Sequence, residues 1–190
     1  MILQRVSIFF FLVLSIAFVS CEPNNPYDTG PAYDIKGNLA KDSVLIANYL
    51  QTADIDSLYR IHDPSGVVII VQEEGDGTRP NTGNVVYTDY TGSLMSDGTV
   101  FDTSLESVAR DNDLYEKDRD YNFLALSLYP LNQQGGFISG WNIAFRRLRP
   151  GSKAVLIIPS TWAYRDNPPK NSNIPDNSIL IFDIDFKGMD

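Results

Sequence analysis

Residues 84–102 read NVVYTDYTGSLMSDGTVFD and contain a strand pattern, a turn and the start of a second strand. Side chains alternate between the two faces of a strand, so Tyr90 points to the same side as the residues two and four positions before it. The sequence SDG at 96–98 is typical of a hairpin turn, after which Phe101 and Asp102 begin the return strand. A carboxylate beside a buried ring is costly unless something hydrogen-bonds it. Asp102 is therefore either a surface residue or part of a pocket wall.

Three further apolar segments predict strands of the same sheet. They are VVIIVQ at 67–72, KAVLIIP at 153–159 and ILIFDIDF at 179–186. The sequence GWNIAFRRLRPG at 140–151 places Trp141, Phe145 and Leu148 on one face and ends in a Pro-Gly pair, which predicts a short helix over 141–148. These elements indicate an α+β fold in which a mostly antiparallel sheet of about five strands closes over one short helix.

The N-terminal residues 1–20 carry one positive charge at Arg5 and then an apolar run, which is typical of a secretory signal peptide. Cys21 is the only cysteine of the chain, and FVSC at 18–21 resembles a bacterial lipobox. We therefore expect a lipoprotein anchored through lipid on Cys21 to a bacterial membrane, facing the periplasm or the cell surface. An ordinary signal-peptidase site beside a free cysteine is the alternative.

After the cysteine, the composition changes twice. Residues 21–37 are rich in Pro, Asn, Asp and Gly, which predicts a flexible tether. Residues 38–65 form an N-terminal helical extension, in which NLAKDSVLIANYLQ spaces its apolar residues as one face of a helix. We expect Asn38 to cap this helix and Asp42 to lie near the positive end of its dipole. Residues 66–190 are then long enough for one domain with a normal core.

The charged and catalytic residues exclude several classes of function. The net charge of −9 argues against a nucleic-acid partner and against electrostatic binding to membranes. His62 is the only histidine and has no candidate partner nearby in the sequence. The acidic segment 105–121 lacks the glycine of a calcium loop, so we expect no metal there but a short helix and a solvated excursion. A hydrolase would have to be built from carboxylates alone.

Five aromatic residues are placed where they can converge on one site. They are Tyr90, Phe101, Trp141, Tyr164 and Phe182. A concave apolar site with a few polar groups is the default hypothesis for a binding site. The alternative is that all five belong to the ordinary core, as most inward-facing aromatic residues do.

Six ordered blocks resemble the signature of the FKBP-type peptidyl-prolyl cis-trans isomerases. The blocks are Tyr90-Thr91-Gly92, Asp97-Gly98 with Phe101-Asp102, Phe137-Ile138-Ser139-Gly140-Trp141, Gly151-Ser152-Lys153, Ile158-Pro159 with Ala163-Tyr164, and Ile174-Pro175 ahead of Leu180-Ile181-Phe182-Asp183. The resemblance runs from about Gly66 to the C-terminus. It implies a half-open sheet wrapped around the short helix, with Trp141 as the floor of a proline pocket.

The resemblance also implies the roles of the site residues. Asp102 accepts a hydrogen bond from the Tyr90 hydroxyl, whereas the Ile138 amide and the Tyr164 hydroxyl bind carbonyl groups of the substrate. The remaining wall residues that the resemblance implies are Phe101, Phe137, Ile174 and Phe182. The expected substrates are proline-containing polypeptides, and the reaction needs no covalent intermediate, metal or cofactor.

The implied function is a prolyl isomerase that assists the folding of exported proteins. Two alternatives remain open, namely a chaperone or peptide-binding module with little catalysis and a surface lipoprotein whose aromatic residues bind a glycan. Arg165 stands where the family usually has glycine, Phe137 is bulkier than the usual residue, Gly136 replaces a commonly acidic residue, and the segment 105–121 is longer than in compact members. Because many relatives pair through N-terminal helices, a homodimer through the helical extension is also a prediction of the resemblance.

Overall fold

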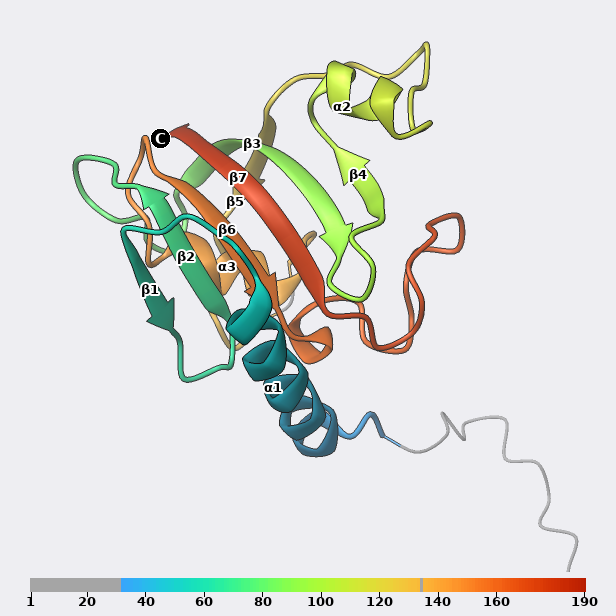
Figure 1. Cartoon of the computed structure of the whole chain (residues 1–190). Helices are drawn as coiled ribbons and strands as arrows, with labels where there is room; N and C mark the ends of the chain where they lie inside the picture. Colours follow the sequence, from blue (N-terminus) through green and yellow to red (C-terminus); the bar gives the residue numbers. More distant parts are fainter. Residues whose placement is uncertain (1–31, 134) are drawn as a thin grey trace, which may run out of the picture. The chain divides into compact units, whose positions relative to one another are not determined.

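The computed structural model describes residues 32–133 and 135–190, and within them the strands form one antiparallel sheet (Figure 1). The strand order is β1-β2-β6-β7-β3-β4, and β5 also pairs with β3. In chain order the elements are α1 (Ile35–Thr52), β1 (Tyr59–His62), β2 (Val68–Glu73), β3 (Val85–Leu94), β4 (Val100–Thr103), α2 (Glu106–Asp111), β5 (Leu124–Ser127), α3 (Ser139–Phe145), β6 (Lys153–Ile158), the 3-10 helix η1 (Ser160–Trp162) and β7 (Leu180–Met189). The predicted α+β fold with an N-terminal helix is confirmed.

The described sheet has seven strands, two more than the expected five or so. The unpredicted strands are β1 and β5, each of four residues, and most of their side chains are exposed or half-buried. Such short edge strands carry no clear alternation of apolar and polar residues, so the sequence pattern did not reveal them. Because β1 lies within the predicted helical extension 38–65, that segment is only partly helical.

In Figure 1, α1 lies in front of the lower end of the sheet and α3 lies behind the sheet. On the α3 side, the fully buried rings of Phe145 and Phe186 meet edge to face with their centroids 5.2 Å apart. On the α1 side, Ile46 packs with Ile70 and Ile157. Burying each such side chain is worth about 1.5–3 kcal/mol. Cover on both faces explains why β2 and β6 are continuous apolar runs and do not alternate.

The short helix α3 lies close against β6 because of a glycine. A Cβ atom on Gly140 would lie 2.3 Å from Cγ2 of Ile158, so any larger residue would push the helix away. The helix runs from Ser139 to Phe145, which corrects the predicted range of 141–148. The chain tightens after Phe145, since Leu148 N donates to Phe145 O three residues earlier (3.2 Å), yet Leu148 is buried as predicted.

The helix α1 begins earlier than the sequence predicted. Its cap is Asp34, whose Oδ1 accepts a hydrogen bond from Gly37 N at 2.9 Å, and not Asn38. The last residues of the predicted tether, from Ile35 onward, are therefore helical. The cap prediction failed because two competing Asx residues lie four positions apart, and only the folded chain shows which one the helix uses.

Several predictions concern residues that the structure does not describe or does not test. The signal peptide 1–20, Cys21 and most of the tether lie outside the described residues. Val44 and Leu45 on α1 are exposed, and dimerisation through this helix stays a prediction. Across residues 32–133 and 135–190, no helix combines the length and hydrophobicity that a membrane crossing requires.

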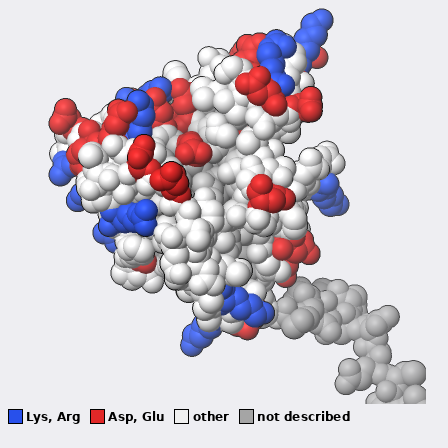
Figure 2. Space-filling view, viewed as in Figure 1, with Lys and Arg blue, Asp and Glu red and all other residues white. Residues whose placement is uncertain are grey.

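The charged segment after β4 projects from the sheet as expected. It contains the short helix α2, in which Arg110 and Glu106 form an ion pair at 2.6 Å. Figure 2 shows acidic and basic side chains crowded together at the upper end of the viewed face, where Figure 1 places α2 and the loop after it. Residues 111–113 and 115–118 of this segment are exposed to solvent, whereas Arg119 contacts Thr103 of β4.

Candidate active site

A cavity of about 770 Å³ opens on the α3 side of the sheet. Eight of the nine predicted pocket residues line it, namely Tyr90, Phe101, Asp102, Phe137, Ile138, Trp141, Tyr164 and Phe182. They come from β3, β4, the start of α3, the loop after η1 and β7. The aromatic residues therefore do converge, although they are separated by up to about half of the chain in sequence.

The ninth residue, Ile174, does not line the cavity, which corrects the prediction. Its side chain is 6% exposed and belongs to the same hydrophobic core cluster as Trp141 and Phe182. Trp141 and Phe182 are equally buried in this cluster but also line the cavity, whereas Ile174 belongs to the cluster without being among the lining residues. The sequence could not separate these two positions, because both require a buried apolar residue in the loop before β7.

Aromatic rings meeting edge to face build the base of the cavity. The Trp141 ring centroid lies 5.2 Å from that of Tyr90 and 5.0 Å from that of Phe182, at interplanar angles of 77° and 88°. Phe101 meets Phe182 at 5.7 Å and 88°. Such contacts contribute about 0.5–1.5 kcal/mol each beyond the area they bury, and they hold the rings in one arrangement.

Gly92 makes this arrangement possible. It lies on β3 opposite Asp102 of β4 and Phe182 of β7. A Cβ atom there would lie 2.7 Å from ring atoms of both Phe101 and Phe182, which is closer than atoms can pack. A side chain at position 92 would therefore displace the rings of Phe101 and Phe182 from the cavity wall.

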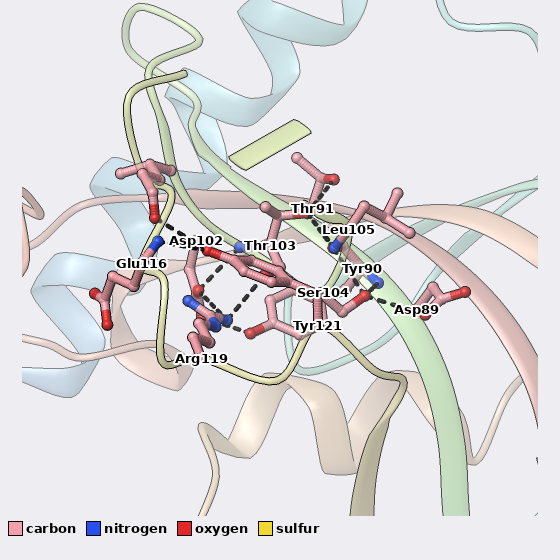
Figure 3. Close-up of polar contacts among 11 residues, drawn as sticks. Asp89, Tyr90, Thr91, Asp102, Thr103, Ser104, Leu105, Glu116, Arg119 and Tyr121 are labelled. Atoms are coloured by element: carbon pink, nitrogen blue, oxygen red, sulfur yellow. Dashed lines mark hydrogen bonds and ion pairs between the residues drawn. The ribbon is translucent and has the colours of Figure 1, made fainter. Parts of the chain in front are cut away.

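Asp102 is hydrogen-bonded on two sides, which answers the question raised by its place beside Phe101. Its Oδ2 accepts from the Tyr90 hydroxyl at 2.5 Å, and its Oδ1 lies 2.8 Å from NH2 of Arg119 (Figure 3). Arg119 NH2 also donates to the Thr103 carbonyl oxygen at 2.8 Å. The carboxylate is a wall residue whose charge is matched by a guanidinium, and it holds the Tyr90 ring in place.

These contacts keep the phenols of the cavity protonated. Burial, followed by the hydrogen bond to Asp102 and its negative charge, raises the pKa of Tyr90 far above its usual value of 10. Burial and the nearby charge of Asp102 also raise the pKa of Tyr164. Partial burial works against the charge on Arg119, but its hydrogen bond and attraction to Asp102 raise its pKa on balance. Neither Tyr90 nor Tyr164 therefore acts as a base near neutral pH.

Several hydrogen-bond donors of residues at the cavity have no partner in the described part of the chain, and Trp141 Nε1 is a fully buried example. No described group accepts from the Ile138 amide or from the Tyr164 hydroxyl. Both residues are half-buried, so a donor here has lost part of its water. A partly buried donor without an acceptor is unfavourable, so a ligand whose carbonyl oxygens accept from these two groups would be stabilised here.

Among the cavity or wall residues that were not predicted as site residues, Arg119, Tyr33 and Arg165 carry polar groups into the site, and each comes from a segment without regular periodicity. Arg119 lies in the charged segment after α2, Tyr33 lies in the predicted tether, and Arg165 was noted only as a departure from the usual glycine. Only the folding back of distant segments brings them to the cavity. Among residues 32–133 and 135–190, no group of three or more His, Cys, Asp and Glu side chains is arranged to hold a metal.

Known proteins resemble this chain in sequence and in fold. A family model described as FKBP-type peptidyl-prolyl cis-trans isomerase matches residues 77–187, more than half of the chain. The FKBP-type peptidyl-prolyl cis-trans isomerase FkpA of Aeromonas hydrophila is 32% identical over 122 residues, which are 64% of this chain and 37% of that protein. The chain spans about a third of the length of the curated FkpA relatives it matches.

Two solved structures share the fold. The crystal structure of FkpA from Escherichia coli has a TM-score of 0.56 and 26% identity, covering 82% of this chain and 61% of that one. A peptidyl-prolyl cis-trans isomerase from Pseudomonas syringae pv. tomato has a TM-score of 0.57 at 21% identity, covering 84% of this chain and 98% of that one, which supports the fold alone. With the family match over residues 77–187, these similarities show that the chain belongs to the FKBP-type peptidyl-prolyl cis-trans isomerase family.

Proposed function

We propose that this protein catalyses the cis-trans isomerisation of peptide bonds before proline in exported polypeptides. The observation that carries the proposal is the cavity over the Trp141 indole, which combines an aromatic lining with the hydrogen-bonded Tyr90–Asp102 pair. Family membership supports the reaction, and the geometry supports the residues that perform it.

The reaction is a rotation about a bond with partial double-bond character. Its barrier is ~18–20 kcal/mol, and the uncatalysed exchange takes tens to hundreds of seconds. The planar ground state owes part of its stability to charge separation, which water favours. Moving the prolyl imide from water into an aromatic cavity should therefore destabilise the planar form relative to the twisted one. No proton has to be transferred, which suits a site whose phenols are protonated and where no histidine lines the cavity.

Each part of the cavity then has a role in the proposed reaction. The Trp141 indole supports the proline ring, and Tyr90, Phe101 and Phe182 surround it. The Ile138 amide and the Tyr164 hydroxyl hold carbonyl oxygens on either side of the twisted bond. An interaction accelerates the reaction only if it is stronger in the transition state than in the ground state. Donors placed for the twisted geometry meet this condition.

The two tryptophans of the chain provide a matched test. Trp141→Phe should strongly reduce kcat/KM in a protease-coupled assay on a short Xaa-Pro peptide, because the floor loses area. Trp162→Phe serves as control, since Trp162 lies outside this cavity and its Nε1 donates to the Ser65 carbonyl oxygen at 2.7 Å. If wild-type protein leaves isomerisation at its spontaneous rate, the catalytic proposal is wrong. Peptide binding without acceleration would instead support the chaperone or peptide-binding module.

We also propose that lipid on Cys21 holds the protein at a bacterial membrane, facing the periplasm or the cell surface. The support is the sequence around Cys21, which lies outside the described residues. Labelled palmitate added to producing bacteria should be incorporated into the wild-type protein and not into Cys21→Ser. Equal labelling of the two proteins would refute the anchor without affecting the isomerase proposal.

A further inference from the structure

The cavity has one wall residue from far outside the family match. Tyr33 precedes α1, whereas the match begins at residue 77, yet Tyr33 lines the cavity together with Arg165. The Tyr33 hydroxyl donates to Oδ1 of Asn177 at 3.0 Å and lies 3.3 Å from Oγ of Ser160. These contacts join the N-terminal segment to η1 and to the loop before β7.

A buried carboxylate fixes this segment in place. Asp42 on α1 is 5% exposed, and its Oδ2 accepts from Ser160 N at 2.8 Å and from Ser160 Oγ at 2.7 Å. Hydrogen bonds to a charged group are worth about 1.5–3 kcal/mol. Because α1 is docked onto η1 in this way, Tyr33 is held at the cavity as part of the folded domain.

Arg165 is held against the ring of Tyr33. Its Cζ lies 5.5 Å from the Tyr33 ring centroid, within range of a cation–π interaction. Its Nε donates to the Thr161 carbonyl oxygen at 3.1 Å, and its own carbonyl accepts from Asn177 N at 2.6 Å. The residue has a φ of 59°, which is unusual without glycine. The backbone and one guanidinium nitrogen are therefore fixed, and the side chain is half-buried at the cavity.

The guanidinium of Arg165 keeps unused hydrogen-bonding capacity. Within residues 32–133 and 135–190, Arg165 forms no ion pair, and of its guanidinium nitrogens only Nε donates to a described group. Neither of the two carboxylates that line the cavity forms an ion pair with the Arg165 guanidinium. Asp102 is paired with Arg119, and Asp166 is exposed. A guanidinium with free terminal nitrogens matches the geometry of a carboxylate.

We propose that Tyr33 and Arg165 form a subsite that binds an acidic side chain next to the substrate proline. The subsite rests on the proposed isomerase function, which supplies the proline in the cavity. It makes Arg165 a residue that determines specificity, and it makes the N-terminal segment part of the substrate site. The net charge of −9 repels acidic peptides at long range, but at about 0.15 M salt such repulsion is screened beyond about 8 Å, so the local contact decides.

Glu and Gln differ in charge but hardly in shape, so they give a matched substrate pair. Isomerisation of blocked Ala-Glu-Pro-Phe and Ala-Gln-Pro-Phe, and of Ala-Ala-Pro-Glu and Ala-Ala-Pro-Gln, is measured by NMR exchange without a protease. In at least one pair, kcat/KM should be about two- to fivefold higher for Glu, as expected for a partly exposed ion pair. The Gln peptide is the internal reference for each variant, so changes in general activity cancel.

Three variants decide whether Arg165 causes the preference. Arg165→Gly restores the usual family residue and relieves the backbone, and it should reduce the Glu:Gln ratio to one or below. Tyr33→Ala should lower the ratio partly, because the guanidinium loses its support. Arg60→Gln on β1 changes the net charge by the same amount as Arg165→Gly at an exposed position outside the cavity and should leave the ratio unchanged.

The proposal is overturned if neither pair favours Glu, if Arg165→Gly keeps the preference, or if Arg60→Gln removes it equally. If no peptide is accelerated, including the Gln peptides, the isomerase function fails while the subsite is still testable. Binding of the same peptides is then followed by the fluorescence of Trp141, with Trp162→Phe as the background so that only this indole is observed. A Kd ratio that favours Glu and depends on Arg165 supports the subsite, and equal Kd values refute it.

Discussion

The two walls of the cavity are built in different ways. The hairpin wall consists of Tyr90, Phe101 and Asp102, which all come from the segment 84–102. The loop wall consists of Tyr33, Tyr164 and Arg165, which come from the N-terminal segment and the loop after η1. In the hairpin wall, a register shift in the pairing of β3 with β4, between Gly92 and Ser93, lets the adjacent residues Phe101 and Asp102 both face the cavity. The loop wall gains Tyr33 through the docking of α1 on η1. The two walls therefore depend on different parts of the chain.

The largest expected effect comes from removing the floor that both walls share. Trp141→Ala should lower the free energy of unfolding by about 3–5 kcal/mol and abolish catalysis, because a large buried ring is replaced by a cavity. Urea denaturation and the isomerase assay measure the two effects. Leu58→Ala, at a side chain 65% exposed, should change stability by less than about 0.5 kcal/mol. If Trp141→Ala still catalysed isomerisation, the indole would not be required for the reaction.

Breaking the support of the loop wall should have the next largest effect on stability. Asp42→Ala leaves the amide and hydroxyl of Ser160 without their acceptor, so we expect a loss of about 2–3 kcal/mol in urea denaturation. Asp56→Ala at an exposed position is the matched control. The Glu:Gln preference should fall in Asp42→Ala. Unchanged stability would mean that α1 does not hold the loop wall.

The charge pair of the hairpin wall should have a smaller effect. A double-mutant cycle of Asp102→Ala and Arg119→Ala should give a coupling free energy of about 0.5–1 kcal/mol, because the side chains are 38% and 32% exposed and solvent screens them. Added salt should reduce the coupling. A coupling near zero at low salt would show that Arg119 does not support Asp102.

The smallest expected effect is that of alkaline pH on catalysis. The raised pKa values of Tyr90 and Tyr164 mean that the folded chain binds these protons more tightly than the unfolded chain. Their contribution to stability is therefore complete below the ordinary phenol pKa of about 10 and is lost only as the pH rises through the raised values. We expect constant kcat/KM from about pH 7 to about pH 9 in a protease-free assay. A fall in kcat/KM centred below pH 9 would indicate that a titrating group outside the proposed mechanism takes part in the reaction.

The hairpin wall and the floor could be predicted because each depends on short-range patterns. The alternation of β3 placed Tyr90 inward, the SDG turn placed Phe101 and Asp102 on β4, and the helical spacing placed Trp141 against the sheet. The family resemblance then added the hydrogen bond between Tyr90 and Asp102, which the structure contains. Short edge strands, helix ends and the place of Ile174 were missed because local pattern does not distinguish them.

By itself, the sequence determined the fold class and the inward faces of the central strands. These features follow from the periodicity of buried side chains, which is written in neighbouring residues. Only the tertiary structure decided that Arg119 pairs with Asp102 and that Tyr33 and Arg165 share a wall. Such contacts join polar or irregular segments far apart in the chain, and they depend on how α1 and the loops pack after the sheet has formed.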